Sequence, residues 1–99
     1  MRQIELHPAA IEESRSAFLW YLERSIHAAN AFMTELDRIV QSISNEPLIG
    51  TEFRPGLRKR QLNRYPFLVV YRELSNDCIE VVAVAHGRRR PGYWSERIG

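Results

Sequence analysis

The chain has 99 residues, a length that forms one small domain with a core of limited size. Its 44% hydrophobic and 26% charged residues are typical of a soluble globular protein, which excludes a disordered tail and a membrane protein. The single cysteine, Cys78, excludes an internal disulfide, and neither a membrane-spanning run nor a signal-peptide core is present. We therefore expect a single domain over residues 1–99 in a reducing cytoplasm.

The net charge of +2 is modest, so the positions of the basic residues are more informative than their number. Lys59 is the only lysine, and most of the basic residues lie after Arg54. This asymmetry predicts a basic working surface in the C-terminal half, facing nucleic acid or an acidic polypeptide.

The first elements are a short strand and a helix. Residues 3–6 alternate polar and apolar, which predicts the strand, and Pro8 then suits the first turn of the helix. Apolar and small residues recur along that helix at spacings of three and four: Ala10, Ile11, Ser14, Ala17, Phe18, Tyr21, Leu22 and Ser25. Leu19 and Trp20 lie outside this stripe, where they either pack on a neighbouring element or form a partner-binding patch.

A second helix should begin near His27 or Ala28 and end before Pro47. Its apolar stripe consists of Phe32, Leu36, Ile39, Val40 and Ile43. The two helices form a hairpin, and the dense prolines and glycines of residues 45–56 predict a loop after it.

Three strands complete the chain. We expect them at residues 57–64, in a run that begins with residues 67–71, and at residues 78–86. The fold class is therefore α+β: a four-stranded, mostly antiparallel sheet, with both helices on one face and the N-terminal strand at its edge or centre. A short tail follows the last strand. The residues expected to be buried together are Phe18, Leu22, Phe32, Leu36, Ile39, Val69 and Val81.

Consecutive hairpins bring chemistry-bearing residues to one end of this sheet. Because antiparallel strands reverse direction, the end of one strand at Arg64 and the end of another at His86 should lie at the same edge, with Arg88 beside them. We expect these three side chains to converge.

Arg58 and Arg60 share a strand face with Leu62 and Arg64 if that strand is regular. Arginines in such a row repel one another unless something negative lies there. The row is either functional or a solvent-facing strand whose charges discourage edge pairing.

The segment that follows the last strand concentrates basic and aromatic side chains: His86, Arg88, Arg89, Arg90, Tyr93 and Trp94. Arginine matches phosphate or carboxylate oxygens two at a time, and the two aromatic rings offer stacking faces. The segment can hold a phosphate or an acidic partner. The alternative is a solvated basic tail.

The element order and three motifs resemble the RelE/ParE toxin superfamily over nearly the whole chain. The motifs are Trp20-Tyr21 in the first helix, Arg64-Tyr65-Pro66-Phe67 before Val69-Val70-Tyr71-Arg72, and Val84-Ala85-His86-Gly87-Arg88-Arg89 before Tyr93-Trp94. The resemblance implies the toxin of a type II toxin–antitoxin pair, held silent in a hetero-oligomer by a cognate antitoxin. RelE-like members cut messenger RNA on the ribosome, whereas ParE-like members poison DNA gyrase.

As a RelE-like nuclease, the chain would need a base, an acid and fixed positive charge. His86 and Tyr93 can transfer protons, and Arg60, Arg64 and Arg88 can supply the charge. The catalytic set in that case is His86, Tyr93, Arg64 and Arg88.

The near absence of lysine and of any carboxylate in the cluster favours the ParE-like, gyrase-directed alternative. The residues expected to bind the target or partner are Arg58, Arg60, Arg88, Arg89, Arg90, Trp94 and Trp20. A non-catalytic module that binds nucleic acid or protein is a third alternative, so whether the chain is an enzyme stays open. His7, His27 and Cys78 lack metal-ligand spacing, and no nucleotide fingerprint is present, so we expect neither metal nor cofactor.

Overall fold

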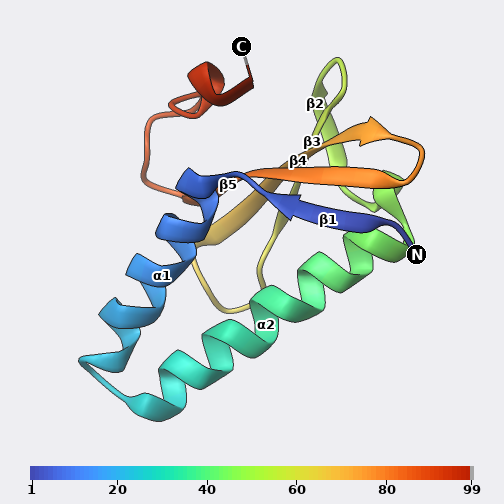
Figure 1. The fold of residues 1–99 in the computed structure, drawn as a ribbon. Helices are drawn as coiled ribbons and strands as arrows, with labels where there is room; N and C mark the ends of the chain where they lie inside the picture. Colours follow the sequence, from blue (N-terminus) through green and yellow to red (C-terminus); the bar gives the residue numbers. More distant parts are fainter. Residues whose placement is uncertain (99) are drawn as a thin grey trace.

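A computed structural model describes residues 1–98 as two helices and a five-stranded sheet (Figure 1). The elements are β1 (Gln3–Leu6), α1 (Pro8–Leu22), α2 (Ile26–Asn45), the 3-10 turn η1 (Pro47–Ile49), β2 (Thr51–Arg54), β3 (Leu57–Gln61), β4 (Phe67–Ser75), β5 (Cys78–His86) and the 3-10 turn η2 (Ser95–Ile98). The strand order is β1-β5-β4-β3-β2, with β1 parallel to β5 and the other pairs antiparallel. The α+β class predicted from the sequence is confirmed. Among the described residues, no helix is long and apolar enough to cross a membrane.

Both helices begin at side-chain caps that the sequence supplies locally. The backbone N–H of Ala9 donates to Nδ1 of His7 at 3.0 Å, and Pro8 needs no partner because it has no N–H. The N–H of Ala28 donates to the hydroxyl of Ser25 at 3.2 Å. The second helix therefore begins at Ile26, slightly earlier than its apolar stripe indicates.

The sheet has one strand more than the sequence analysis predicted. Pro55 and Gly56 form a tight turn between β2 and β3, and Gly56 has a φ of +79°, which is easily adopted only by glycine. The proline- and glycine-rich stretch before β3 thus contains an edge strand, β2, and is only partly a loop. The N-terminal strand occupies the opposite edge.

The main core lies between the helices and the sheet. Its buried residues include five of those predicted: Phe32, Leu36, Ile39, Val69 and Val81. Phe18 is only half-buried, and the prediction for Leu22 is wrong because its side chain is 39% exposed. Figure 1 shows that the hairpin turn after α1 projects beyond the sheet, so the last turn of α1 has no strand beneath it. Tyr21 fills this end of the core by packing against Phe32 and Tyr65.

A second, smaller core covers the other face of the sheet, since side chains alternate between faces along a strand. Its buried residues are Leu57, Val70, Val82, Ala83, Ala85 and Trp94. Trp94 belongs to the segment after β5, so this segment crosses the sheet edge and closes the second face.

A candidate binding groove between α1 and the C-terminal segment

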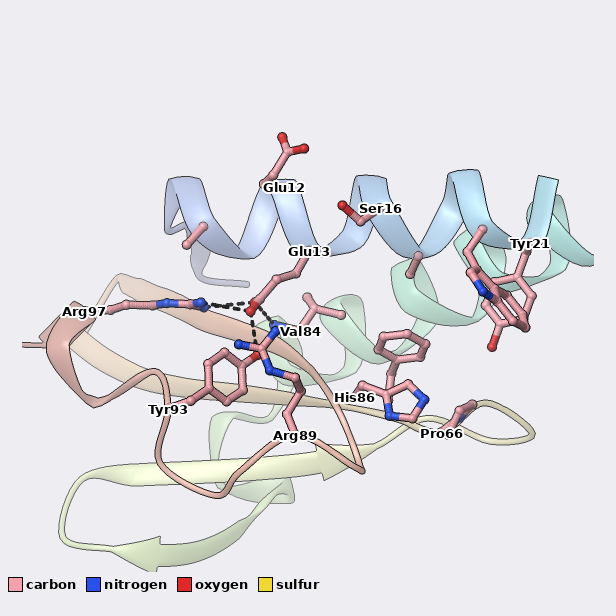
Figure 2. A pocket seen from close by; sticks show the side chains of 14 residues that line it. Glu12, Glu13, Ser16, Tyr21, Pro66, Val84, His86, Arg89, Tyr93 and Arg97 are labelled. Atoms are coloured by element: carbon pink, nitrogen blue, oxygen red, sulfur yellow. Dashed lines mark hydrogen bonds and ion pairs between the residues drawn. The ribbon is translucent and has the colours of Figure 1, made fainter. Parts of the chain in front are cut away.

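A groove of about 620 Å³ lies between α1 and the C-terminal segment (Figure 2). It is lined by Ala9, Glu12, Glu13, Ser16, Ala17, Trp20, Tyr21, Pro66, Phe67, Val84, His86, Arg89, Tyr93 and Arg97. One wall is a single face of α1, the floor is the end of β5 with the start of β4, and the other wall is the segment after β5. The groove thus joins the first helix to residues more than forty positions later in the chain.

The Glu13 side chain makes polar contacts with three other residues of this groove. Its carboxylate accepts two hydrogen bonds from the guanidinium of Arg97, both at 2.9 Å, in a bidentate ion pair. It also accepts a short hydrogen bond from the hydroxyl of Tyr93 and one at 3.0 Å from the backbone N–H of Val84. Figure 2 shows these groups converging on the Glu13 side chain from the strand and the C-terminal segment. Four donor groups of three residues therefore hold one helix carboxylate.

The Glu13–Arg97 pair also satisfies backbone groups at the edge of β5 that no strand pairs with. Strand β1 pairs only with residues 78–81 of β5, and the register with β4 skips Val82, which forms a bulge. Beyond β1, the carbonyl of Val82 accepts from Arg97 at 3.0 Å, and the N–H of Val84 donates to Glu13. A neighbouring parallel strand satisfies this same combination, a carbonyl and the N–H two residues on, with the N–H and the C=O of one of its residues. Here an ion pair of side chains takes the place of that strand.

The environment of Glu13 shifts two pKa values in opposite directions. Burial alone raises the pKa of the Glu13 carboxyl, but the hydrogen bonds from Arg97, Tyr93 and Val84 outweigh burial and hold it below its usual 4.5. Burial, together with the hydrogen bond to the Glu13 carboxylate, raises the pKa of Tyr93 to about 12. The Tyr93 hydroxyl is therefore a proton donor fixed on a carboxylate.

The lowered pKa predicts a specific acid sensitivity. Because Glu13 has a lower pKa in the folded chain than in the unfolded chain, its contribution to stability is present above pH 4.5 and is lost as the pH falls through the folded-state value. We expect the urea midpoint of the wild type to fall between about pH 5 and pH 2 more steeply than that of Glu13→Gln. Parallel curves for the two proteins would contradict this assignment.

The structure brings His86, Arg89 and Trp20 to the groove. The ring of His86 meets Phe67 edge to face at 5.1 Å, and its Nδ1 accepts the N–H of Arg88 at 3.0 Å, which leaves Nε2 as its remaining polar atom. The guanidinium of Arg89 lies 3.9 Å from the centre of the Tyr93 ring. Trp20 is 52% exposed at the other end. Its ring packs edge to face on Tyr21, and the guanidinium of Arg24 lies 3.4 Å from its centre, so a role of Trp20 in binding a partner stays a prediction.

Arg64 does not line the groove, although its turn adjoins the end of β5, where Gly87 donates to the carbonyl of Pro66. Strand β3 ends at Gln61, and Arg64 lies exposed in the following turn with a φ of +68°. Arg88 and Arg90 are exposed on the segment after β5 and do not line the groove. They are available to a partner from outside it.

Arg58 and Arg60 share the helix-facing side of β3 with Leu62, as the period of two predicts, but both are half-buried. Arg58 donates to the carbonyl of Gly50 at 2.8 Å, and Arg60 donates to the hydroxyl of Ser42 on α2. These two arginines fasten β3 to α2 and to the segment that follows it. A solvent-facing strand therefore does not describe them, and their role in binding a target stays a prediction.

Trp94 is also placed differently from the prediction. It is only 5% exposed and packs edge to face on Phe53, with ring centres 5.6 Å apart, in the second core. A residue so buried cannot serve as a stacking face for a partner, and its hydrophobic area instead anchors the C-terminal segment.

Sequence reasoning missed Glu13 and Arg97, and the statement that no carboxylate joins the cluster is wrong. A signal for Glu13 existed: it lies between Ala10 and Ala17 at spacings of three and four, on the face of α1 that the stripe predicts to be buried. A charged residue on such a face needs a partner. Nothing in the sequence identified Arg97 as that partner. Among residues 1–98, no His, Cys, Asp and Glu side chains form a group of three that could hold a metal ion.

Comparisons with known proteins agree with this architecture. The family model described as "ParE toxin of type II toxin-antitoxin system, parDE" matches residues 4–91. Ten chains among the solved structures match. One of them is described as "Chromosomal ParDE TA system from P. aeruginosa" and is 16% identical to this chain, with a TM-score of 0.61. The match covers 87% of this chain and 96% of that one. That likeness shows the fold, and no curated protein matches by sequence. The family match covers most of the chain, which therefore belongs to the ParE toxin family of type II toxin–antitoxin systems.

Proposed function

We propose that this protein arrests growth in the cytoplasm by binding DNA gyrase, and that it does not cut RNA. The observation that carries this choice is the state of Tyr93. Its hydroxyl donates to Glu13, and its pKa of about 12 keeps it protonated near neutral pH. A general base must lose its proton near the working pH, and an efficient general acid must give it up there. Its hydrogen bond to Glu13 and its raised pKa both make Tyr93 a weaker proton-transfer group than a free tyrosine.

The other residues of the expected catalytic set give the nuclease alternative little support. Arg64 does not line the groove, and His86 has only Nε2 left for proton transfer, because its Nδ1 accepts the N–H of Arg88. The arginines at 88, 89 and 90 remain as a basic, exposed docking surface on the segment after β5. Docking on a large protein requires such a surface and no proton transfer.

The proposal includes neutralisation by a cognate antitoxin in a toxin–antitoxin hetero-oligomer. Membership of the ParE family supports a partner of this kind. The basic segment after β5 and the exposed apolar residues of the helical hairpin both need covering, so an acidic and apolar antitoxin segment would fit them.

Inducible expression tests the target. We expect growth arrest with gyrase-dependent DNA breaks and intact transcripts. Tyr93→Phe should retain toxicity, since it removes one hydroxyl and leaves the exposed arginines unchanged. A nuclease that lost its general acid or base would instead slow by about a hundred- to ten-thousand-fold.

Two results would contradict the proposal in different ways. Ribosome-dependent cleavage of transcripts, lost in Tyr93→Phe at unchanged thermal stability, would establish the RelE-like alternative. A folded wild type that leaves growth untouched at high level would favour the non-catalytic binding module.

A further inference from the structure

One face of α1 is apolar and exposed. The helix packs on α2 and β5 with its inner face, and Figure 1 places it at one side of the molecule. On the outer face, Ile11, Leu19 and Leu22 are 51%, 44% and 39% exposed, and Ile26, just after the hairpin turn, is 68% exposed. Positions 11, 15, 19 and 22 share this face because they are spaced by four, four and three residues. We define the outer stripe as Ile11, Arg15, Leu19, Leu22 and Glu23.

The two charged residues of the outer stripe are placed symmetrically about Leu19. Arg15 precedes Leu19 by four residues, about one helical turn, and Glu23 follows it by four, in a helical backbone conformation. Their side chains are 67% and 78% exposed. Arg15 lies 3.9 Å from Glu12, and Glu23 lies 4.0 Å from Arg24. Exposed ion pairs of this kind contribute little stability, so both charges are available to a partner.

This spacing makes the outer stripe complementary to a second copy of itself. When two α1 helices pack antiparallel about a two-fold axis at Leu19, a residue that precedes Leu19 faces the residue that follows Leu19 by the same number in the other copy. Leu19 then meets Leu19 of the second copy, and Arg15 meets Glu23 on both sides of the axis. Ile11 of each copy reaches the hairpin turn of the other, where Ile26 is exposed.

We propose that the outer stripe is the interface of a homodimer, formed by two antiparallel α1 helices. Both copies contribute the same surface, so the assembly closes at two subunits. An acidic partner suits the stripe less well, since it would meet Glu23 as well as Arg15. Trp20 lines the groove, on another face of α1, and the dimer leaves it exposed to other partners. The inference goes beyond the proposed function and does not depend on which target the protein has.

The interface is small, so the association should be weak. The helix has 15 residues and is roughly 22 Å long. One face of such a helix buries less than the roughly 800 Å² per partner of a standard interface. We expect a dissociation constant on the order of 10 μM. Sedimentation velocity of the full chain, at concentrations on both sides of that value, measures it.

Charge reversal tests the register of the two helices. Arg15→Glu places two glutamates at each contact point, and Glu23→Arg places two arginines there. Each variant alone should therefore dimerise at least about tenfold more weakly than the wild type. The two variants mixed in equal amounts should form a heterodimer, because every contact point then joins a glutamate to an arginine. The double variant Arg15→Glu, Glu23→Arg should dimerise like the wild type for the same reason.

A matched pair of leucine variants tests the apolar centre. Leu19→Asp places two carboxylates at the axis and should abolish dimerisation. Leu48→Asp should leave dimerisation unchanged, because Leu48 is 68% exposed in η1, at the other end of α2 from the hairpin turn. Circular dichroism melting curves check that every variant is folded.

Several outcomes would overturn the inference. A wild type that stays monomeric at about ten times the expected dissociation constant would do so, and would leave the outer stripe to a different protein. A dimer that survives Leu19→Asp, or that Leu48→Asp weakens equally, would place the interface elsewhere. Folded charge-reversed variants that associate no better as a mixture than alone would exclude the pairing of Arg15 with Glu23.

Discussion

Glu13→Ala is expected to lower the free energy of unfolding by about 3 kcal/mol, a large fraction of the stability of a domain of this size. The change leaves the half-buried guanidinium of Arg97 without its counter-charge and takes away the acceptor of Tyr93 and of the Val84 N–H. At this chain length such a loss corresponds to a fall in melting temperature of roughly 12–24 °C. Urea unfolding followed by circular dichroism measures it.

A double-mutant cycle separates the ion pair from the rest of the contact. Arg97→Ala should cost about 2–3 kcal/mol by itself, and the double variant Glu13→Ala, Arg97→Ala should cost much less than the sum, because neither charge is then left unpaired. Glu12→Ala, on the solvent side of the same helical turn, should change stability by less than about 0.5 kcal/mol. Equal effects of the changes at residues 12 and 13 would show that the Glu13 contacts contribute nothing.

Trp94→Ala should cost about 3–5 kcal/mol, since it empties a ring-sized volume from the second core. We expect the variant to unfold near physiological temperature and to lose toxicity for that reason. Thermal melting, compared with growth inhibition at a lower temperature, distinguishes loss of the fold from loss of a contact.

The conservative control is Trp94→Phe, which keeps an aromatic ring on Phe53 and should remain folded and toxic. If Trp94→Ala melted like the wild type yet were no longer toxic, Trp94 would be a binding residue after all, as the sequence analysis expected.

Periodicity was sufficient for most of the fold. The stripe with Phe32 and Leu36 placed the second helix, and the alternating run beginning at Cys78 predicted β5 with the bounds observed. Both elements are long, so the pattern of their apolar residues alone identifies them. Strand β2 was missed because the proline and glycine residues beside it dominate the local composition.

The site was harder to predict, because its geometry depends on contacts between distant segments. His86 and Arg89 reach the groove because His86 ends β5 and Arg89 comes soon after it. The burial of Trp94 in the second core could not be predicted, since it depends on the turns of the segment after His86, which place the ring on the second face of the sheet. The partnership of Glu13 with Arg97 links residues 84 positions apart, and no local pattern encodes a contact at that separation.

The substitution of a strand by the Glu13–Arg97 pair has a consequence for how such chains can change during evolution. A backbone edge accepts any residue sequence in the strand that pairs with it, because the pairing groups are peptide groups. Here both pairing groups are side chains, so the edge of β5 is closed only by an acid on the first helix and an arginine near the end of the chain. Relatives that retain the short β1 should therefore gain or lose the two residues together, and relatives with one of them alone should have a longer first strand.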